Sequence, residues 1–254
     1  MKRVSRIVLG LSLPAFILLL WWLFTSIGAV PRQILPAPQV VWAVYLNPAA
    51  RGKMAGHLLI SLRRVFIGFS AASVIGVAAG SLTGVSKTMK AVILPTLTAV
   101  RQIPIIAWVP LIILWFGIGE IAKVVIIVTA AFFVIYVNTH AGISETPEEY
   151  LELARLYKLS GIRTFVSVNL PCALPNILTG LQLGLGVSWM AVVASELISA
   201  TSGIGYYMND ARFQLRPDIM IACMLVIGIV GVLMNTALTV LFSKVMPWNS
   251  REGG

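Results

Sequence analysis

Long stretches without a charged residue are the feature of this sequence that most restricts its fold. A helix needs roughly 20 apolar residues to cross the hydrocarbon core of a bilayer. The runs predict six transmembrane helices, at 7–28, 62–85, 91–116, 121–143, 172–198 and 218–243. Only 11% of the residues are charged, against about 25% in an average soluble domain. We therefore predict an all-α, polytopic membrane protein. A disordered chain, a nucleic-acid-binding domain and a disulfide scaffold are excluded.

The chain is expected to form a single transmembrane domain over 1–254, with an N-terminal span in 1–30 and a five-helix core in 58–246. A cleaved signal peptide is an alternative for the first span, because it has a basic start and small residues at Ser26 and Gly28. However, the apolar region of a signal peptide runs about 7–15 residues, and this one exceeds 20. We interpret it as an uncleaved span.

Basic residues predict the orientation, because they are enriched in cytoplasmic loops. With the N-terminus inside, ten lysines and arginines fall on the cytoplasmic side and eight outside. The N-terminal cluster of Lys2, Arg3 and Arg6 decides between the two orientations. Both termini are then cytoplasmic. The net charge of +10 reflects this anchoring at the membrane lipid surface and does not indicate a nucleic-acid partner.

Small residues recur at every fourth position in two of the predicted spans. This spacing lets two helix backbones approach closely in lipid. We interpret both series as internal helix packing, with a subunit interface as the alternative. The residues are Gly68, Ala72, Gly76, Gly80 and Gly84 in one span, and Gly180, Gly184 and Ser188 in another.

Several polar or helix-breaking residues lie at membrane depth and are candidates for a transport pathway. Arg101 falls about ten residues into its span, roughly 15 Å along a helix. It either pairs structurally or lines a path for an anion, since buried ionisable groups usually face a cavity or a partner. Pro104, close to Trp108, interrupts the helix. Glu196 lies near the outer end of its span, where a structural pair is the alternative.

Motifs for catalysis or cofactor binding are missing. The sequence has no G-x-x-x-x-G-K-[ST] loop, so the chain does not itself bind ATP in that way. The G-x-G-x-x-A match at 117–122 joins two membrane spans and lacks the strand that a dinucleotide site requires. We predict no catalytic residue, no metal site and no cofactor in this chain. Cys172 and Cys223 lie in apolar runs and are expected to be buried packing residues.

The one long polar insertion is 145–171, between the fourth and fifth spans. Thr146 is suited to the N-cap of a helix, Pro147 to its first position, and Glu149 to completing a capping box. We expect this helix to end near Leu159, and a turn at Ser160-Gly161 to lead into a second helix, 162–170, that ends before Pro171. Such a well-capped structure outside the membrane suggests a docking element.

This insertion resembles the cytoplasmic loop of permease subunits of binding-protein-dependent ABC importers. That loop reads E-A-A, three residues, Gly, nine residues, I-x-L-P. The present chain has the same spacing, with Leu153, Lys158 and Val168 in place of Ala, Gly and Ile. Lys158 replaces the Gly of the bend, and we expect Gly161 to supply the bend instead. The resemblance implies that the ATPase-coupling residues are Glu152, Ala154, Lys158, Gly161, Leu170 and Pro171, with Ala154 on the face that meets the ATPase.

Further segments are similar to the sulfonate, taurine and nitrate branch of that family, among them 34–38, 61–64, 102–111, 115–120, 195–198 and 202–206. The resemblance implies a multi-pass permease of the bacterial inner membrane, with a second permease copy as a homodimer. Two copies of an ABC ATPase would hold ATP-Mg, and a periplasmic or lipid-anchored binding protein would deliver substrate. An aliphatic sulfonate is the leading substrate, ahead of taurine, nitrate or another small solute.

A stand-alone secondary transporter is the alternative from a different class. Such a protein would use intramembrane carboxylates for ion coupling, and only Glu196 is a candidate.

Overall fold

The computed structural model describes residues 2–245, with side chains from 12 to 244. All regular elements in this part of the chain are helices, and it contains no strand. Its elements are α1 (Lys2–Ser26), α2 (Pro38–Leu46), α3 (Pro48–Val85), α4 (Lys87–Val100), α5 (Ile105–Phe116), α6 (Glu120–Ser144), α7 (Glu148–Leu156), α8 (Gly161–Thr164), the π-helix η1 (Phe165–Asn169), α9 (Leu170–Ser199), α10 (Ile204–Phe213) and α11 (Pro217–Val245).

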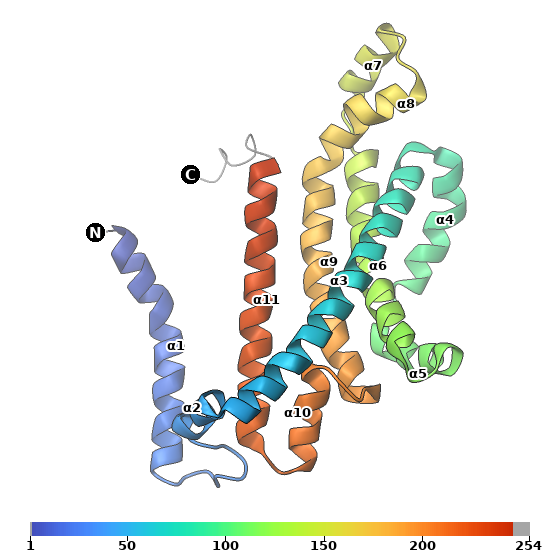
Figure 1. Cartoon of the computed structure of the whole chain (residues 1–254). Coiled ribbons are helices and arrows are strands. Elements are labelled where there is room, and N and C mark those ends of the chain that lie inside the picture. The colour runs from blue at the N-terminus through green and yellow to red at the C-terminus, as the bar shows by residue number, and fades with distance from the viewer. Residues whose placement is uncertain (1, 246–254) are drawn as a thin grey trace.

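Three long helices form the centre of the bundle (Figure 1). α3 crosses the bundle obliquely and packs along α6, and α6 packs along α9. α7 and α8 project from one end of the bundle, the same end at which α1 begins and α11 ends. α2 and α10 lie at the opposite end, and α1 stands at the edge beside α2. The loop predicted to dock a partner is thus on the same side as the start of α1 and the end of α11.

The small residues of α3 lie against β-branched residues of α6. A Cβ added to Gly68 would meet Ile127 at 2.6 Å, one on Gly80 would meet Thr139 at 2.6 Å, and one on Gly84 would meet Ile143 at 2.5 Å. On α9, a Cβ on Gly184 would meet Ile135 of α6 at 2.7 Å. Both predicted series are therefore used for packing inside the chain, which was the preferred interpretation.

A methyl group at Gly68 is expected to destabilise the bundle. Gly68→Ala must push α3 away from α6 or move Ile127, and overpacking of this kind costs about 1–3 kcal/mol. The measurement is the thermal unfolding midpoint of the purified chain in detergent. Gly186→Ala on α9 is the matched control, because nothing lies within 4 Å of its added Cβ and Ala favours a helix by about 1 kcal/mol. A Gly68→Ala midpoint equal to that of the wild type would contradict the close approach.

The membrane spans differ in part from those predicted. Four helices are long and apolar enough to cross a bilayer: α3, α6, the continuous helix from Gly161 to Ser199, and α11. The predicted span 62–85 is the second part of α3, which starts 14 residues earlier, at Pro48. In α1, residues 12–26 form a shorter apolar helix. Neither α2 nor α10 was predicted, because both are short segments outside the long apolar runs.

The predicted span over 91–116 is interrupted at Pro104, as the sequence indicated. The chain forms two helices there, α4 and α5, which are bent by 98° relative to each other. The break occupies 101–104 and ends at Pro104. Proline disfavours the helical conformation of the residue before it, so the helix stops there. Pro95 and Pro110 lie within α4 and α5 without interrupting them.

Candidate functional site

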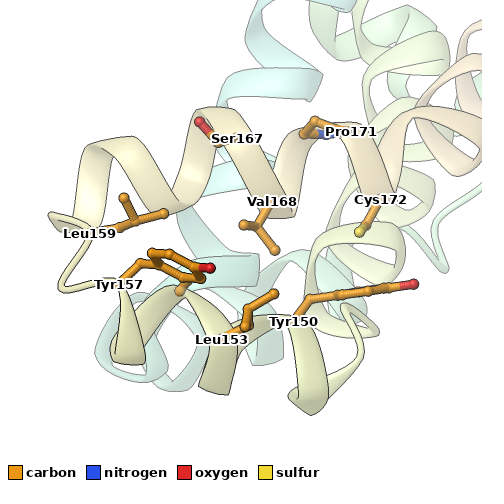
Figure 2. Close-up of a pocket in the computed structure, with 9 residues that line it drawn as sticks. Tyr150, Leu153, Tyr157, Leu159, Ser167, Val168, Pro171 and Cys172 are labelled. Atoms are coloured by element: carbon orange, nitrogen blue, oxygen red, sulfur yellow. The ribbon is translucent and has the colours of Figure 1, made fainter.

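The loop between α6 and α9 folds back on itself and encloses a cleft of about 300 Å³. Figure 2 shows Tyr150 and Leu153 on α7, and Tyr157 directly after it, facing Val168 and Cys172 on the returning chain. The lining is almost entirely apolar. It consists of Tyr150, Leu153, Ala154, Tyr157, Leu159, Ser167, Val168, Pro171 and Cys172. The structure thus brings together two of the predicted coupling residues, Ala154 and Pro171.

α7 turns one apolar side inward and leaves another exposed. Ala154 is only 4% exposed and faces the cleft, so it would meet the ATPase, as predicted from the resemblance, only where a part of the ATPase enters the cleft. The helical spacing turns Ala154 toward the returning chain. Leu153 and Leu156 are exposed, Leu156 by 78%, and Glu152 is exposed as well. The outward surface of α7 is therefore apolar with a carboxylate beside it.

The capping box predicted at Thr146 is not formed. The N-cap of α7 is Pro147, and no side chain caps it. The Thr146 hydroxyl instead donates to the carbonyl oxygen of Ile143 at 2.9 Å and accepts from Asn169 Nδ2 at 3.3 Å. Because Thr146 and Asn169 are both buried, this contact ties the beginning of the loop to its end.

The turn after α7 is made by Lys158 and not by Gly161. α7 ends at Leu156, three residues earlier than predicted. Lys158 has a φ of 51°, in the left-handed region. The Leu159 amide donates to the Ala154 carbonyl, and the Lys158 amide donates to the Arg155 carbonyl, which together define a Schellman motif. Gly161 has no positive φ; it starts α8. Lys158 thus occupies the conformation for which glycine is best suited.

Lys158→Gly is expected to stabilise the loop. A non-glycine residue in the left-handed region costs roughly 1–2 kcal/mol, and glycine there removes this strain. The measurement is the rate of proteolysis at Arg155 in the assembled membrane protein, which should fall. Gly161→Ala serves as the control: Gly161 has no positive φ and its added Cβ has open space, so it should leave the rate unchanged. Faster cleavage of Lys158→Gly would contradict the role given to the turn.

The second loop helix was predicted to end before Pro171, but the helix continues past that residue. α8 continues through η1 directly into α9, and the Leu170 amide donates to the Phe165 carbonyl five residues back. A proline removes one amide donor from a helix and crowds the preceding turn. The π-helical turn accommodates Pro171 without ending the helix. The second loop helix and the span are therefore one continuous element. Leu170, at the start of α9, packs beside Ile143 and Ala173.

The pathway candidates lie elsewhere in the bundle. Arg101 is the C-cap of α4 and Pro104 the N-cap of α5, so both lie in the break, where both are exposed. Trp108 is half-buried on α5. Its indole Nε1 is buried and has no hydrogen-bond partner within the described part of the chain. These three residues are neighbours in the sequence, and Trp108 packs in a cluster with Val187 and Ala191 of α9.

Glu196 belongs to a cluster of charges at the end of the bundle opposite α7. Arg64 is 2% exposed and donates from Nη1 to Glu196 Oε1 at 2.7 Å. Arg64 Nε and Nη2 donate to the two carboxylate oxygens of Glu120, at 2.8 and 2.5 Å. The same guanidinium donates to the Ser202 carbonyl oxygen at 2.7 Å. Glu196 is 1% exposed. It is therefore enclosed in a structural ion pair, which was the alternative to a role in the pathway.

The same cluster caps α10. The first amides of that helix find their acceptors on other helices: Gly203 donates to His57 Nδ1 at 3.1 Å, Ile204 to Ser61 Oγ at 2.9 Å, and Gly205 to Glu196 Oε2 at 2.9 Å. Gly203 has a φ of 110°, and a Cβ there would overlap the Glu196 carboxylate. Glycine is therefore required at this position by both conformation and space.

Sequence reasoning missed Arg64, Ser61 and His57. A signal was present, since residues 57, 61 and 64 have the i, i+4, i+7 spacing of one helix face. It was hidden because the span was predicted to begin at 62, which left His57 and Ser61 outside it and separated them from Arg64.

The architecture defines the chain as a polytopic helical membrane protein with a helical loop at one end. A match over residues 72–248 to the binding-protein-dependent transport system inner membrane component family identifies the chain as a member of that family. The resemblance inferred from 145–171 is therefore confirmed. Members of this family are inner-membrane, multi-pass permease components of ABC importers. They work with an ATPase and a substrate-binding protein and are not themselves catalysts.

Several relatives are similar over nearly their whole length. SsuC of Bacillus subtilis (strain 168), named for aliphatic sulfonates transport, is 36% identical over 96% of this chain and 89% of its own. The taurine transport system permease protein TauC of Escherichia coli (strain K12) is 33% identical over 96% and 90%. The nitrate import permease protein NrtB of Leptolyngbya laminosa is 32% identical over 91% and 85%.

Solved structures agree with the fold. A chain of the MetNI methionine ABC transporter, in an inward-facing conformation, matches with a TM-score of 0.61 at 17% sequence identity, covering 76% of this chain and 99% of its own. A chain of an amino acid ABC transporter crystallised with histidines matches with a TM-score of 0.62 at 18% identity, covering 77% and 93%. At this level of identity the likeness concerns the fold alone.

Proposed function

We propose that this chain, paired with a second copy of itself, forms the translocation pathway of an ABC importer for a small organic anion, with an aliphatic sulfonate as the leading substrate. The observation that carries the proposal is the 36% identity, over 96% of the chain, to a protein named for aliphatic sulfonates transport. Taurine and nitrate follow, because relatives named for them are nearly as similar.

The proposed topology has six spans, with both termini and α7 in the cytoplasm. In this topology α1 and the broken pair α4–α5 each provide one span in addition to the four long helices. The start of α1, the end of α11 and the α7–α8 loop lie at one end of the bundle (Figure 1), which supports the arrangement. The basic N-terminal residues then face the cytoplasm, as the distribution of charge favours.

In the proposed coupling step, each of two ATPase subunits holds one α7 in a surface cleft. ATP binding closes the ATPases and tilts the permeases toward the outward-open state, and a binding protein delivers substrate on that side. The exposed side of α7, with Leu156, would enter the ATPase, and Glu152 would make a polar contact at the edge. Support comes from the continuous helix through Pro171, because α8, which follows α7 after the turn at Lys158, runs directly into α9.

Arg101 is proposed to neutralise the substrate as it passes. Its position in the α4–α5 break supports this role, since irregular backbone at membrane depth is found where it lines a cavity or is buried in protein. Arg101→Gln removes a charge-assisted hydrogen bond, worth about 1.5–3 kcal/mol, and should lower uptake roughly tenfold to a hundredfold. The measurement is uptake at matched amounts of assembled complex. An equal loss of assembled complex would mean that Arg101 is structural.

Reconstitution tests the function directly. The chain would be placed in proteoliposomes with its ATPase and binding protein, and uptake of radiolabelled ethanesulfonate would be measured with taurine or nitrate as competitors. The expected result is uptake that requires ATP and is blocked best by other alkanesulfonates. Stronger competition by taurine or nitrate would reassign the substrate. Uptake by the chain alone, without the ATPase, would refute the ABC mechanism in favour of a secondary transporter.

A further inference from the structure

A group of uncharged polar side chains connects α9 and α11 inside the membrane region. Gln182 Nε2 on α9 donates to Asn235 Oδ1 at 3.1 Å and to Thr239 Oγ1 at 3.0 Å, both on α11. These contacts are exposed at the surface of the chain, and not enclosed in its core. Further polar residues extend the group along both helices, with Thr179 on α9 and Ser243 on α11.

The depth of these residues follows from helix geometry. Gln182 lies 12 residues after the start of α9 at Leu170, and Asn235 lies ten residues before the end of α11 at Val245. At 1.5 Å per residue these separations are about 18 Å and about 15 Å. Because the hydrocarbon core is about 30 Å thick, both side chains lie well inside it, near its middle.

The polar residues form lines, not a scattered patch. Thr179 and Gln182 are three residues apart on α9, and Asn235, Thr239 and Ser243 are four residues apart on α11. These spacings keep each line on one face of its helix. Both lines run toward the end of the bundle that carries α7. The three hydroxyls donate to backbone carbonyls of their own helices, at Pro175, Asn235 and Val240. The cost of exposing this polar track to lipid tails, where unsatisfied polar groups find no water, therefore falls on the amides of Gln182 and Asn235.

The track also has hydrogen-bonding capacity left over. Gln182 uses its amide hydrogens and Asn235 uses its carbonyl oxygen. Within the described residues, Asn235 Nδ2 has no acceptor. Neutral amide and hydroxyl donors can bind the oxygens of an anion. They do so more weakly than a fixed positive charge, because hydrogen bonds between charged partners are about twice as strong as neutral ones. Such donors therefore suit a site through which an anion passes.

We propose that Gln182, Asn235 and Thr239 line the middle of the translocation pathway. Asn235 donates from Nδ2 to an oxygen of an oxyanion substrate, and Gln182 holds the Asn235 amide in place through the Asn235 carbonyl oxygen. This inference rests on the proposed function, since it takes the substrate to be a small anion. It assigns the exposed face between α9 and α11 to the aqueous path, and not to lipid or to the contact between two copies.

Thiol accessibility tests the assignment. In a Cys172→Ser, Cys223→Ala background, Asn235→Cys would be compared with Leu233→Cys in the complete transporter. Leu233 is 61% exposed and lies two positions away, about 200° around the helix. A membrane-impermeant maleimide should label Asn235→Cys at least tenfold faster than Leu233→Cys. Ethanesulfonate delivered by the binding protein should slow this labelling. Equal rates, or no protection by ethanesulfonate, would overturn the proposal.

Two further measurements complete the test. Oxidation that joins two copies through Asn235→Cys would show a contact between copies and overturn the proposal. In the natural sequence, Gln182→Glu should lower ethanesulfonate uptake at least tenfold by repelling the anion, and Gln182→Asn, which keeps the donor, should lower it less. Equal uptake by both variants would also overturn it. The background variant must itself show ATP-driven uptake; failure there would be a failure of the proposed function, and not of this inference.

Discussion

Leu156→Asp is expected to abolish association of the chain with its ATPase while leaving the chain folded in the membrane. Leu156 is 78% exposed on the outward side of α7, so an aspartate there is well solvated in the free permease. In the proposed complex the same carboxylate would be buried without a partner, at a cost of about 3–5 kcal/mol. A loss of about 4 kcal/mol corresponds to roughly thousandfold weaker binding. The measurement is pull-down of the ATPase at matched membrane levels.

The matched control is Ile162→Asp, which adds the same charge on the neighbouring helix α8 at similar exposure. It should retain the ATPase. Ala154→Asp makes a different change, because it places a carboxylate in the apolar cleft between α7 and the returning chain, and it should disturb the loop itself. Normal pull-down by Leu156→Asp would move the contact away from α7. Loss of the ATPase by Ile162→Asp as well would mean that the whole loop surface is required.

Arg64→Met is expected to have the second large effect, a loss of about 3–5 kcal/mol in the stability of the bundle. The substitution leaves Glu196 buried without its cation, and an uncompensated buried charge is what makes a broken ion pair costly. The measurement is the thermal unfolding midpoint in detergent together with the amount of chain in the membrane. Arg63→Met, at the adjacent and less buried arginine, should change the midpoint little.

The double variant Arg64→Met, Glu196→Met separates charge from packing. Replacing both partners of a buried pair by apolar residues is often close to neutral. The unfolding midpoint of the double variant should therefore lie between those of Arg64→Met and the wild type. Recovery would be incomplete, because Glu196 also accepts a hydrogen bond from the Gly205 amide. A double variant less stable than Arg64→Met alone would show that Glu196 is needed mainly as the cap of α10.

The sequence predicts the spans best where apolar runs end in charge or at a helix stop. Residues 121–143 and 172–198 fall within one or two residues of α6 and α9, because packing of small residues against branched ones supports the same helices that hydropathy indicates. The sharp bend at 101–104 could not be predicted, since hydropathy continues across it and only Pro104 marks it. The loop positions were found by spacing, whereas their orientation was not: Ala154 faces inward and Lys158 makes the turn.

Residues that act through distant contacts were the hardest to predict. The ion pair of Arg64 and Glu196 joins positions 132 residues apart, and nothing local in the sequence reports that distance. The polar track is a similar case, because Gln182 and Asn235 are unremarkable within their own helices and become conspicuous only when α9 and α11 lie side by side.

The way α10 is capped has a consequence for how the chain is made. α10 is ten residues long, shorter than the 12–15 residues at which an isolated helix becomes even marginally stable in water. Its first amides depend on His57 and Ser61, which are synthesised about 140 residues earlier. α10 therefore cannot be completed during its own synthesis and must wait until α3 and α9 have met in the bilayer. Its formation marks the end of assembly at that end of the bundle. In the proposed topology, a chain with a misplaced α3 would carry an unwound segment open to periplasmic proteases.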